Sequence, residues 1–211
     1  MRFDLSLYLV LDPDLCGGVD GMIDTTRHAI DAGVTIVQLR APDWKKRQWF
    51  EAATRLKALL APRGVPLIIN DQIDVALAVD ADGIHIGQDD LPPDAARALI
   101  GPHKLLGFSV SDAAQWSSAP LDLIDYLGVG PVLPTSTKPD AAPALGLDAF
   151  AALMRAKPCP VVAIGGIHAG NTAALIAAGA DGVAVVSAIC GQPDVPTATH
   201  ALAHAISGAR T

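Results

Sequence analysis

The sequence predicts an α/β fold with one closed parallel barrel, and three observations indicate it. Short, continuous apolar runs alternate about eight times with alanine-rich segments in which apolar residues recur every three or four positions. A glycine recurs where a helix stops and a buried strand begins, as in Ala32-Gly33-Val34 and Ala81-Asp82-Gly83. No linker or low-complexity stretch divides the chain. Because eight βα units close a barrel whereas an open sheet needs about five or six, we expect residues 1–211 to form a single (β/α)8 TIM barrel.

Strands are expected where a short apolar run stops at a polar residue, a proline or a glycine. The first run, from Leu7, is ended at once by Asp12 and Pro13. In chain order, the expected strands are residues 7–11, 35–39, 67–69, 83–86, 105–108, 126–129, 161–164 and 183–186.

Helices are expected where apolar residues recur at helical spacing, as Phe50, Ala53, Leu56 and Leu60 do. In chain order, the expected helices are residues 22–32, 45–60, 73–79, 94–100, 112–118, 147–155, 171–178 and 197–206. The stretch 131–146 is too long for a simple connection, and its length and composition predict a loop that closes over a substrate.

Composition excludes several classes of protein. A hydrophobic content of 51% with 18% charged residues is typical of a globular core, yet no apolar stretch approaches the ~20 residues of a membrane span. The apolar run near the N-terminus is too short for a signal peptide, so we expect a cytoplasmic protein. The net charge of −7 argues against a nucleic-acid partner, because phosphate backbones attract clustered Lys and Arg.

The cysteines and the outer surface are less informative. Cys16, Cys159 and Cys190 are an odd number at wide spacings, which predicts reduced, structural thiols rather than disulfides or a zinc site. His200 and His204 have the i, i+4 spacing of a metal pair but belong to the last helix, where a surface role is expected. The oligomeric state is left open, although barrels with an apolar, alanine-rich exterior often form homo-oligomers.

Polar groups or glycines follow seven consecutive strands, from the second to the eighth. Barrel enzymes place their chemistry in the loops after the carboxyl ends of the strands, so these groups are expected to share one rim. Any one of them could be a helix cap, but the whole series favours a functional site. They are Gln38, Arg40, Asn70, Asp71, Gln88, Asp89, Asp90, Ser109, Thr135, Ser136, Thr137, Lys138, Gly165, Gly166 and Ser187.

Several of these groups suit anions. The run 128–138 ends in hydroxyls and Lys138, which exceeds what a turn alone requires. Arg40 can grip an oxyanion with two parallel hydrogen bonds, and Asn70 offers an amide. The backbone N–H groups at Gly165-Gly166 and after Val186 can face a phosphate, although tight turns need glycine anyway.

Asp71 and Asp90 follow neighbouring strands, so their carboxylates can converge on one hard cation. Mg²⁺ prefers a few carboxylates together with substrate phosphate oxygens, which predicts magnesium here rather than zinc or calcium. The alternatives are a helix cap for Asp71 and a solvated acid for Asp90.

With these residues, the chain resembles the thiamine-phosphate synthase family over almost its whole length. The resemblance is carried by residues 37–40, 69–71, 81–92, 125–138, 163–167 and 180–189. It implies a transferase of thiamine biosynthesis. This enzyme joins an aminopyrimidine methyl diphosphate to a thiazole phosphate, giving thiamine phosphate and diphosphate.

The resemblance also implies roles for individual residues. It makes Gln38, Arg40, Asn70, Ser109 and Lys138 ligands of the pyrimidine diphosphate, with Arg40, Lys138 and Ser109 in catalytic roles. It makes Asp71 and Asp90 the magnesium ligands. It makes Thr135, Ser136, Thr137, Gly166, Val186 and Ser187 the cradle of the thiazole phosphate.

Two departures from the family pattern affect the half of the site that is expected to bind the diphosphate. Pro42 stands where the family usually has a lysine, and Lys45 or Lys46 is the candidate substitute. Val110-Ser111 replaces an Ala-His pair after Ser109. Two alternatives to the synthase therefore remain: the paralogous thiazole tautomerase, and a non-catalytic binder of thiamine precursors.

Overall fold

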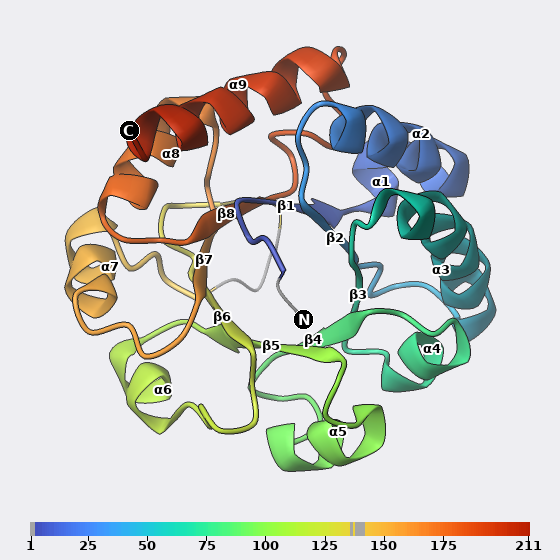
Figure 1. Cartoon of the computed structure of the whole chain (residues 1–211), viewed down its shortest axis with the longest axis horizontal. Coiled ribbons are helices and arrows are strands. Elements are labelled where there is room, and N and C mark those ends of the chain that lie inside the picture. The colour runs from blue at the N-terminus through green and yellow to red at the C-terminus, as the bar shows by residue number, and fades with distance from the viewer. Residues whose placement is uncertain (1–2, 136, 138–141) are drawn as a thin grey trace.

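The computed structural model describes residues 3–135, 137 and 142–211, and eight parallel strands close a barrel at its centre (Figure 1). Each strand pairs with the next, and β8 pairs with β1. The strands are β1 (Leu7–Leu11), β2 (Ile36–Leu39), β3 (Leu67–Asn70), β4 (Gly83–Ile86), β5 (Leu105–Val110), β6 (Tyr126–Val129), β7 (Val161–Ile164) and β8 (Gly182–Val185). The predicted fold class is confirmed.

Helices surround the barrel as an outer ring (Figure 1). They are α1 (Pro13–Cys16), α2 (Gly18–Asp31), α3 (Lys46–Leu60), α4 (Ile73–Ala78), α5 (Pro93–Ile100), α6 (Ala113–Ser118), α7 (Leu147–Met154), α8 (Ala169–Ala177) and α9 (Val195–Ala209), with a 3-10 turn at Ala61–Arg63. Eight of these correspond to predicted helices. The short helix α1 was not predicted, although Asp12 caps it and Pro13 occupies its first turn, which is a known start signal.

Two apolar cores lie on the two sides of the strands. Leu7, Leu9 and Leu11 point outward and pack with the helices in the larger core. Tyr8 and Val10, which alternate with them, point inward to a smaller core inside the barrel. Both faces of the strands are therefore buried, which explains why the strands read as continuous apolar runs.

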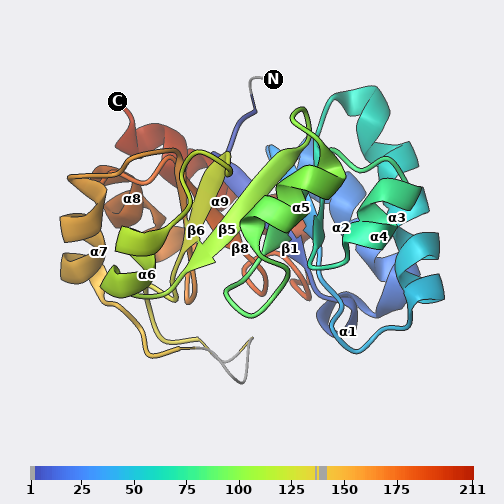
Figure 2. The same ribbon diagram turned by 90° about the horizontal axis from the view of Figure 1, so that it is seen from below.

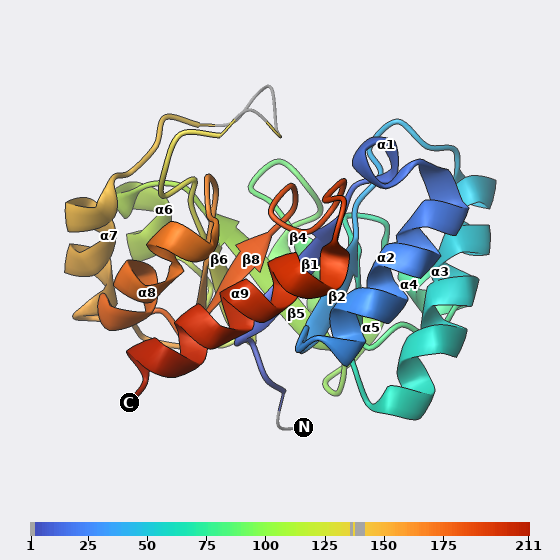
Figure 3. The ribbon, with the colours of Figure 1, turned by 90° about the horizontal axis from the view of Figure 1, so that it is seen from above.

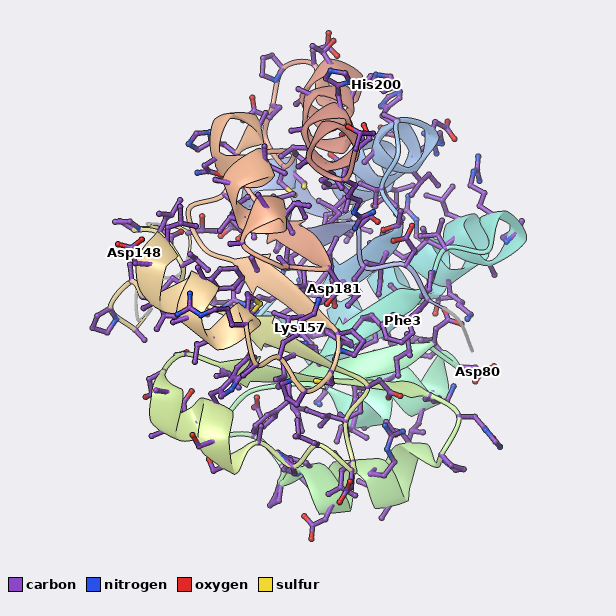
Figure 4. All side chains as sticks on the ribbon, turned by 60° about the vertical axis from the view of Figure 1, so that its left-hand side comes forward. Phe3, Asp80, Asp148, Lys157, Asp181 and His200 are labelled. Atoms are coloured by element: carbon purple, nitrogen blue, oxygen red, sulfur yellow. The ribbon has the colours of Figure 1, made fainter. Side chains whose placement is uncertain are left out.

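The end of the barrel at which the strands begin is tied by a repeated ion pair. Asp82, Asp125 and Asp181 each precede a strand, and each accepts a backbone N–H from the first or second residue of the preceding strand, at 2.8–2.9 Å. Each also pairs with a cation from an outer helix or the turn after it, at 2.7–2.8 Å: Lys57, Arg97 and Lys157 respectively. Figure 4 shows the Lys157 and Asp181 pair. These contacts join neighbouring βα units at the end where the chain termini lie (Figure 2).

The opposite end carries the longer loops, which stand above the strands in Figure 3. The described ends of the 131–146 stretch are anchored there, because Leu145 and Gly146 donate their N–H groups to the carbonyls of Pro131 and Val132 at 2.9 Å. Among the described residues, no helix is long and apolar enough to cross a membrane.

Candidate active site

A cavity of about 590 Å³ opens at the carboxyl ends of the strands. The described residues that were assigned to the substrates or to the metal all line this one cavity; they are Gln38, Arg40, Asn70, Asp71, Asp90, Ser109, Thr135, Thr137, Gly166, Val186 and Ser187. Gln88 and Asp89, which were also expected at the rim, are not among the described residues that line it. Ser136 and Lys138 lie outside the described residues. The barrel therefore brings together groups that are as much as 149 positions apart in the chain, from Gln38 to Ser187.

Parallel pairing explains how β2 and β3 place their polar groups. Val10 lies opposite Gln38, and Gln38 lies opposite Ile68, so Gln38 takes an inward position. Arg40 follows at the rim. Among the described residues, no carboxylate forms an ion pair with the Arg40 guanidinium, which leaves its donors for an anion in the cavity.

Asp71 has an uncommon backbone conformation. Its φ is 58°, in the left-handed region, and its N–H donates to the carbonyl of His85 at 2.9 Å. Asn70 donates its side-chain N–H to Oδ2 of Asp71 at 2.6 Å. This conformation is strained for any residue other than glycine. Here the strained residue places a carboxylate on the cavity wall.

The donor set at the two acids suits a magnesium ion. Asp71 and Asp90 both line the cavity, and Oδ2 of Asp90 accepts the backbone N–H of Gly87 at 2.7 Å. Among the described residues, no cluster of three or more His, Cys, Asp or Glu side chains could form a full protein cage. Two carboxylates beside an open cavity match Mg²⁺, which takes its remaining ligands from phosphate oxygens and water.

A chain of hydrogen bonds crosses the inside of the barrel and links two of the predicted substrate ligands. Gln38 donates its amide N–H to the Tyr8 hydroxyl at 2.7 Å, and the hydroxyls of Tyr8 and Tyr126 lie 2.8 Å apart. The Tyr126 hydroxyl lies 3.1 Å from Nδ1 of His85, and Nε2 of His85 lies 2.9 Å from Oγ of Ser109.

The donors along this chain can be assigned from its first member. Because Gln38 donates to Tyr8, the Tyr8 proton is available for Tyr126, and the Tyr126 proton for Nδ1 of His85. Burial lowers the pKa of His85 to about 4, against the opposing effect of Asp90, so the imidazole is neutral at pH 7. In the arrangement in which every bond of the chain is donated from Gln38 toward Ser109, the single proton of His85 is on Nε2 and the O–H of Ser109 is left to donate into the cavity.

Two glycines make room for this chain. A Cβ on Gly107 would lie 2.2 Å from Cζ of Tyr126 and 2.4 Å from Nδ1 of His85. A Cβ on Gly128 would lie 3.0 Å from Cε1 of His85. Both glycines are on strands, so their role is close approach rather than backbone freedom.

Two further glycines shape the opposite side of the cavity. Gly165 and Gly166 both have positive φ, 96° and 67°. A Cβ on Gly166 would lie 2.5 Å from the carbonyl oxygen of Pro134. The two glycines are therefore also needed because the loop after β6 packs closely against them. Asn171 at the start of α8 donates to the carbonyl of Gly166 at 2.9 Å and holds the turn.

After β8 the chain makes a short turn at the rim. The N–H groups of Ile189 and Cys190 donate to the carbonyl of Val186 at 3.0 and 2.8 Å, and Gln192 donates its side-chain N–H to the carbonyl of Ser187 at 2.7 Å. Ser187 stands at the beginning of this turn and lines the cavity. Ser187 and the backbone of this turn are therefore the groups after β8 that could hold an anion.

Sequence reasoning missed several residues of the cavity wall. Tyr8 and His85 lie inside apolar strands; His85 is buried and hydrogen-bonded, and both residues also line the cavity. Knowing which positions of β1 and β4 point into the barrel would have identified them. The sequence does not show this, because both faces of these strands are buried. His168 also lines the cavity, and its Nδ1 accepts the N–H of Gly170 at 3.1 Å.

Other candidates do not join the site. Lys46 donates to Gln72 and pairs with Asp74 at 2.6 Å, and neither it nor Lys45 is among the described residues that line the cavity. His200 lies on α9 at the periphery of the molecule (Figure 4). Ser111, one of the two departures after Ser109, does line the cavity.

Comparisons with known proteins agree on one family. Residues 7–189 match the family model described as thiamine monophosphate synthase. The chain is 54% identical over 205 residues to a thiamine-phosphate synthase of Laribacter hongkongensis, covering 97% of this chain and 96% of that protein. It is 51% identical over 208 residues to the enzyme of the same name from Xanthobacter autotrophicus, covering 99% and 98%. The solved thiamine phosphate pyrophosphorylase from Pyrococcus furiosus superposes with a TM-score of 0.88 at 34% identity, covering 98% of each chain.

Proposed function

The chain belongs to the thiamine monophosphate synthase family and is an enzyme of the transferase class, and on this premise we propose how its cavity joins an aminopyrimidine methyl diphosphate to a thiazole phosphate. The products are thiamine phosphate and diphosphate. In the proposed dissociative substitution, the carbon–oxygen bond to diphosphate breaks first, and the thiazole nitrogen then attacks the pyrimidine methylene carbon.

The pyrimidine diphosphate is assigned to the side of the cavity formed after β2 to β5. Arg40 binds diphosphate oxygens through its guanidinium, and Asn70 adds an amide donor. Gln38 and Ser109 hold the pyrimidine from the two ends of the hydrogen-bond chain. Lys138, which lies outside the described residues, is assigned to the leaving group because the family resemblance places it there.

The thiazole phosphate is assigned to the other side, between the turns after β7 and β8. Gly166, Val186 and Ser187 offer backbone and hydroxyl donors there. Thr135 and Thr137 line the cavity from the loop after β6, and Ser136 is assigned with them from its place in the chain. The two substrates thereby meet across the barrel mouth, and holding them there supplies much of the rate.

Asp71 and Asp90 would hold Mg²⁺, and the ion would neutralise negative charge on the diphosphate as it leaves. Arg40 and Lys138 stabilise the same charge. Ser109, held by neutral His85, orients the pyrimidine while the bond breaks. We further propose a cytoplasmic location, which the three free cysteines support.

The observation that carries this proposal is that the described residues assigned to both substrates and the carboxylates of Asp71 and Asp90 line one cavity. The test is diphosphate release and thiamine phosphate formation by the purified protein with both substrates, with and without Mg²⁺. We expect both products only with Mg²⁺. Thiazole phosphate binding without turnover would instead support the tautomerase or the non-catalytic binder.

The metal assignment is tested separately. Asp71→Asn and Asp90→Asn should each lower kcat/KM by about 10²-fold or more and raise the Mg²⁺ concentration at half-maximal rate. Asp89→Asn is the matched control, because Asp89 is an exposed neighbour of Asp90 that is not among the described residues lining the cavity. Equal effects at positions 89 and 90 would overturn the assignment.

A further inference from the structure

Two of the three cysteines lie next to each other at the rim, on the segments that follow the first and last strands. Cys16 ends α1, and Cys190 is part of the turn after β8. The two thiols lie close enough for each to shift the pKa of the other, and the Cys190 Sγ lies 3.6 Å from the carbonyl oxygen of Val10. The pair spans the seam where the barrel closes between β8 and β1.

The two segments also touch through their backbones. A Cβ on Gly191 would lie 3.2 Å from the carbonyl oxygen of Leu15. Each cysteine is followed by a glycine with positive φ, 77° at Gly17 and 76° at Gly191. Figures 2 and 3 both show the loop after β8 beside α1. The glycine that follows each cysteine gives the backbone the freedom to move the two sulfurs to the ~2.05 Å separation of a disulfide bond.

We propose that Cys16 and Cys190 form a reversible disulfide that regulates the phosphate side of the cavity. The pair is a modification site distinct from the residues assigned to the substrates. Reduced, it is a thiol–thiol contact under the rim; oxidised, it is a covalent tie between the β1–α1 and β8–α9 connections.

The environments of the two thiols assign different roles to them. The neighbouring Cys190 thiol lowers the pKa of the Cys16 thiol, and Thr25 acts in the same direction. The Cys16 thiol and burial raise the pKa of Cys190 well above its ordinary value. Cys16 is only half-buried, so it is the thiol that an oxidant reaches first, and Cys190 is the resolving thiol.

The reaction with a small disulfide such as glutathione disulfide then has two steps. The Cys16 thiolate attacks one sulfur of the oxidant, forms a mixed disulfide and releases one glutathione thiolate. Cys190 loses its proton to that thiolate or to water and displaces the second glutathione from Cys16. Two protein thiols are oxidised, and one glutathione disulfide is reduced to two glutathione molecules.

The effect on the site follows from the position of Cys190, and this step rests on the proposed function. Cys190 donates its N–H to the carbonyl of Val186, in the same turn that Ser187 begins. Pulling the Cys190 sulfur toward Cys16 shifts this turn relative to Gly166. We therefore expect oxidation to raise the KM for thiazole phosphate several-fold while the KM for the pyrimidine diphosphate changes little.

The first test does not depend on activity. The folded protein is treated with glutathione disulfide or diamide, alkylated and cut with a protease specific for the amino side of Asp. That digestion places Cys16 in residues 14–19, Cys190 in residues 181–193 and Cys159 in residues 148–180, so each thiol is on its own peptide. We expect the 14–19 and 181–193 peptides to be linked, and dithiothreitol to release them.

The matched control is Cys159, which lies in the turn before β7 at the other end of the barrel and whose pKa is raised by burial. Cys159→Ser should leave the linked peptide unchanged, and Cys16→Ser should abolish it. The linked form should also show a Tm higher by about 10 °C, since the bond closes a loop of most of the chain. Free, alkylated Cys16 and Cys190 after both oxidants would overturn the proposal.

The second test is steady-state kinetics of the oxidised and reduced enzyme. The several-fold rise in KM for thiazole phosphate should be absent in Cys16→Ser and reversed by dithiothreitol. A disulfide that forms without changing this KM would overturn the regulatory role. A protein that forms the disulfide but makes no thiamine phosphate in either state would instead refute the proposed function, so the two failures are distinguishable.

Discussion

Acidification should destabilise this protein through one buried imidazole. His85 is only 9% exposed and lies inside the barrel, where burial lowers its pKa to about 4. In the unfolded chain the same group has its ordinary value of about 6.5. Between these two values the unfolded state binds a proton that the native state does not bind, so the free energy of unfolding falls as the pH falls from about 6.5 to about 4 and then levels off.

The magnitude follows from the two pKa values. The difference between 6.5 and about 4 is about 2.5 pKa units, and each unit is worth ~1.4 kcal/mol, so His85 should account for about 3 kcal/mol between pH 7 and pH 4. This is a large share of the ~5–15 kcal/mol by which domains are usually stable.

The assay is urea unfolding at a series of pH values for the wild type, His85→Gln and His204→Gln. Gln at position 85 can still donate toward Ser109 but does not titrate, so its unfolding free energy should lose about 3 kcal/mol less over this range. His204 is exposed, and its variant should follow the wild type. Asp74, Asp80 and Asp194, whose pKa values are lowered, add the same acid dependence to all three proteins.

Two results would refute this reasoning. One is an identical pH dependence of unfolding for the wild type and His85→Gln. The other, which needs no variant to fold, is an NMR titration of the His85 ring with a midpoint near 6.5 in the native protein.

Three further predictions concern packing and the hydrogen-bond chain. Arg97→Met removes the donor to three backbone carbonyls and the partner of Asp125, so we expect a loss of about 2–4 kcal/mol in chemical denaturation with kcat/KM unchanged; a loss below ~1 kcal/mol would contradict this. Gly107→Ala should destabilise by at least ~2 kcal/mol and lower activity, because its Cβ has no space beside Tyr126, whereas Gly208→Ala on α9 should be neutral or stabilising in the same measurement. Tyr126→Phe interrupts the chain between Tyr8 and His85, so the KM for the pyrimidine diphosphate should rise while that for thiazole phosphate stays constant, and equal changes in both would argue against a positioning role.

Much of the fold could be predicted because it depends on local patterns. All eight strands lie within a residue or two of their predicted bounds, since each is an apolar run between turn signals. The helix α1 was missed because four residues are too few to show a periodicity. Asp82 was noticed only as part of a repeated turn. The pairing of Asp82, Asp125 and Asp181 with Lys57, Arg97 and Lys157 needed the packed helices.

Some residues of the candidate site could likewise be predicted from local patterns, and others could not. Arg40, Asp71, Asp90 and Ser187 could be named from the sequence, because each lies in the loop that follows a strand and parallel strands end at one rim. Tyr8 and His85 could not be placed in the cavity, since they lie within strands whose inward and outward positions are both buried.

By itself, the sequence determined the class of fold, the family and the rim on which the chemistry lies, because periodicity and short motifs are local properties of the chain. Only the tertiary structure decided which side of each strand faces inward, that Gln38, Tyr8, Tyr126, His85 and Ser109 form one hydrogen-bond chain, and that Cys16 meets Cys190. These relations join residues as many as 174 positions apart, from Cys16 to Cys190. They depend on strand register and on closure of the barrel between β8 and β1, which no local pattern encodes.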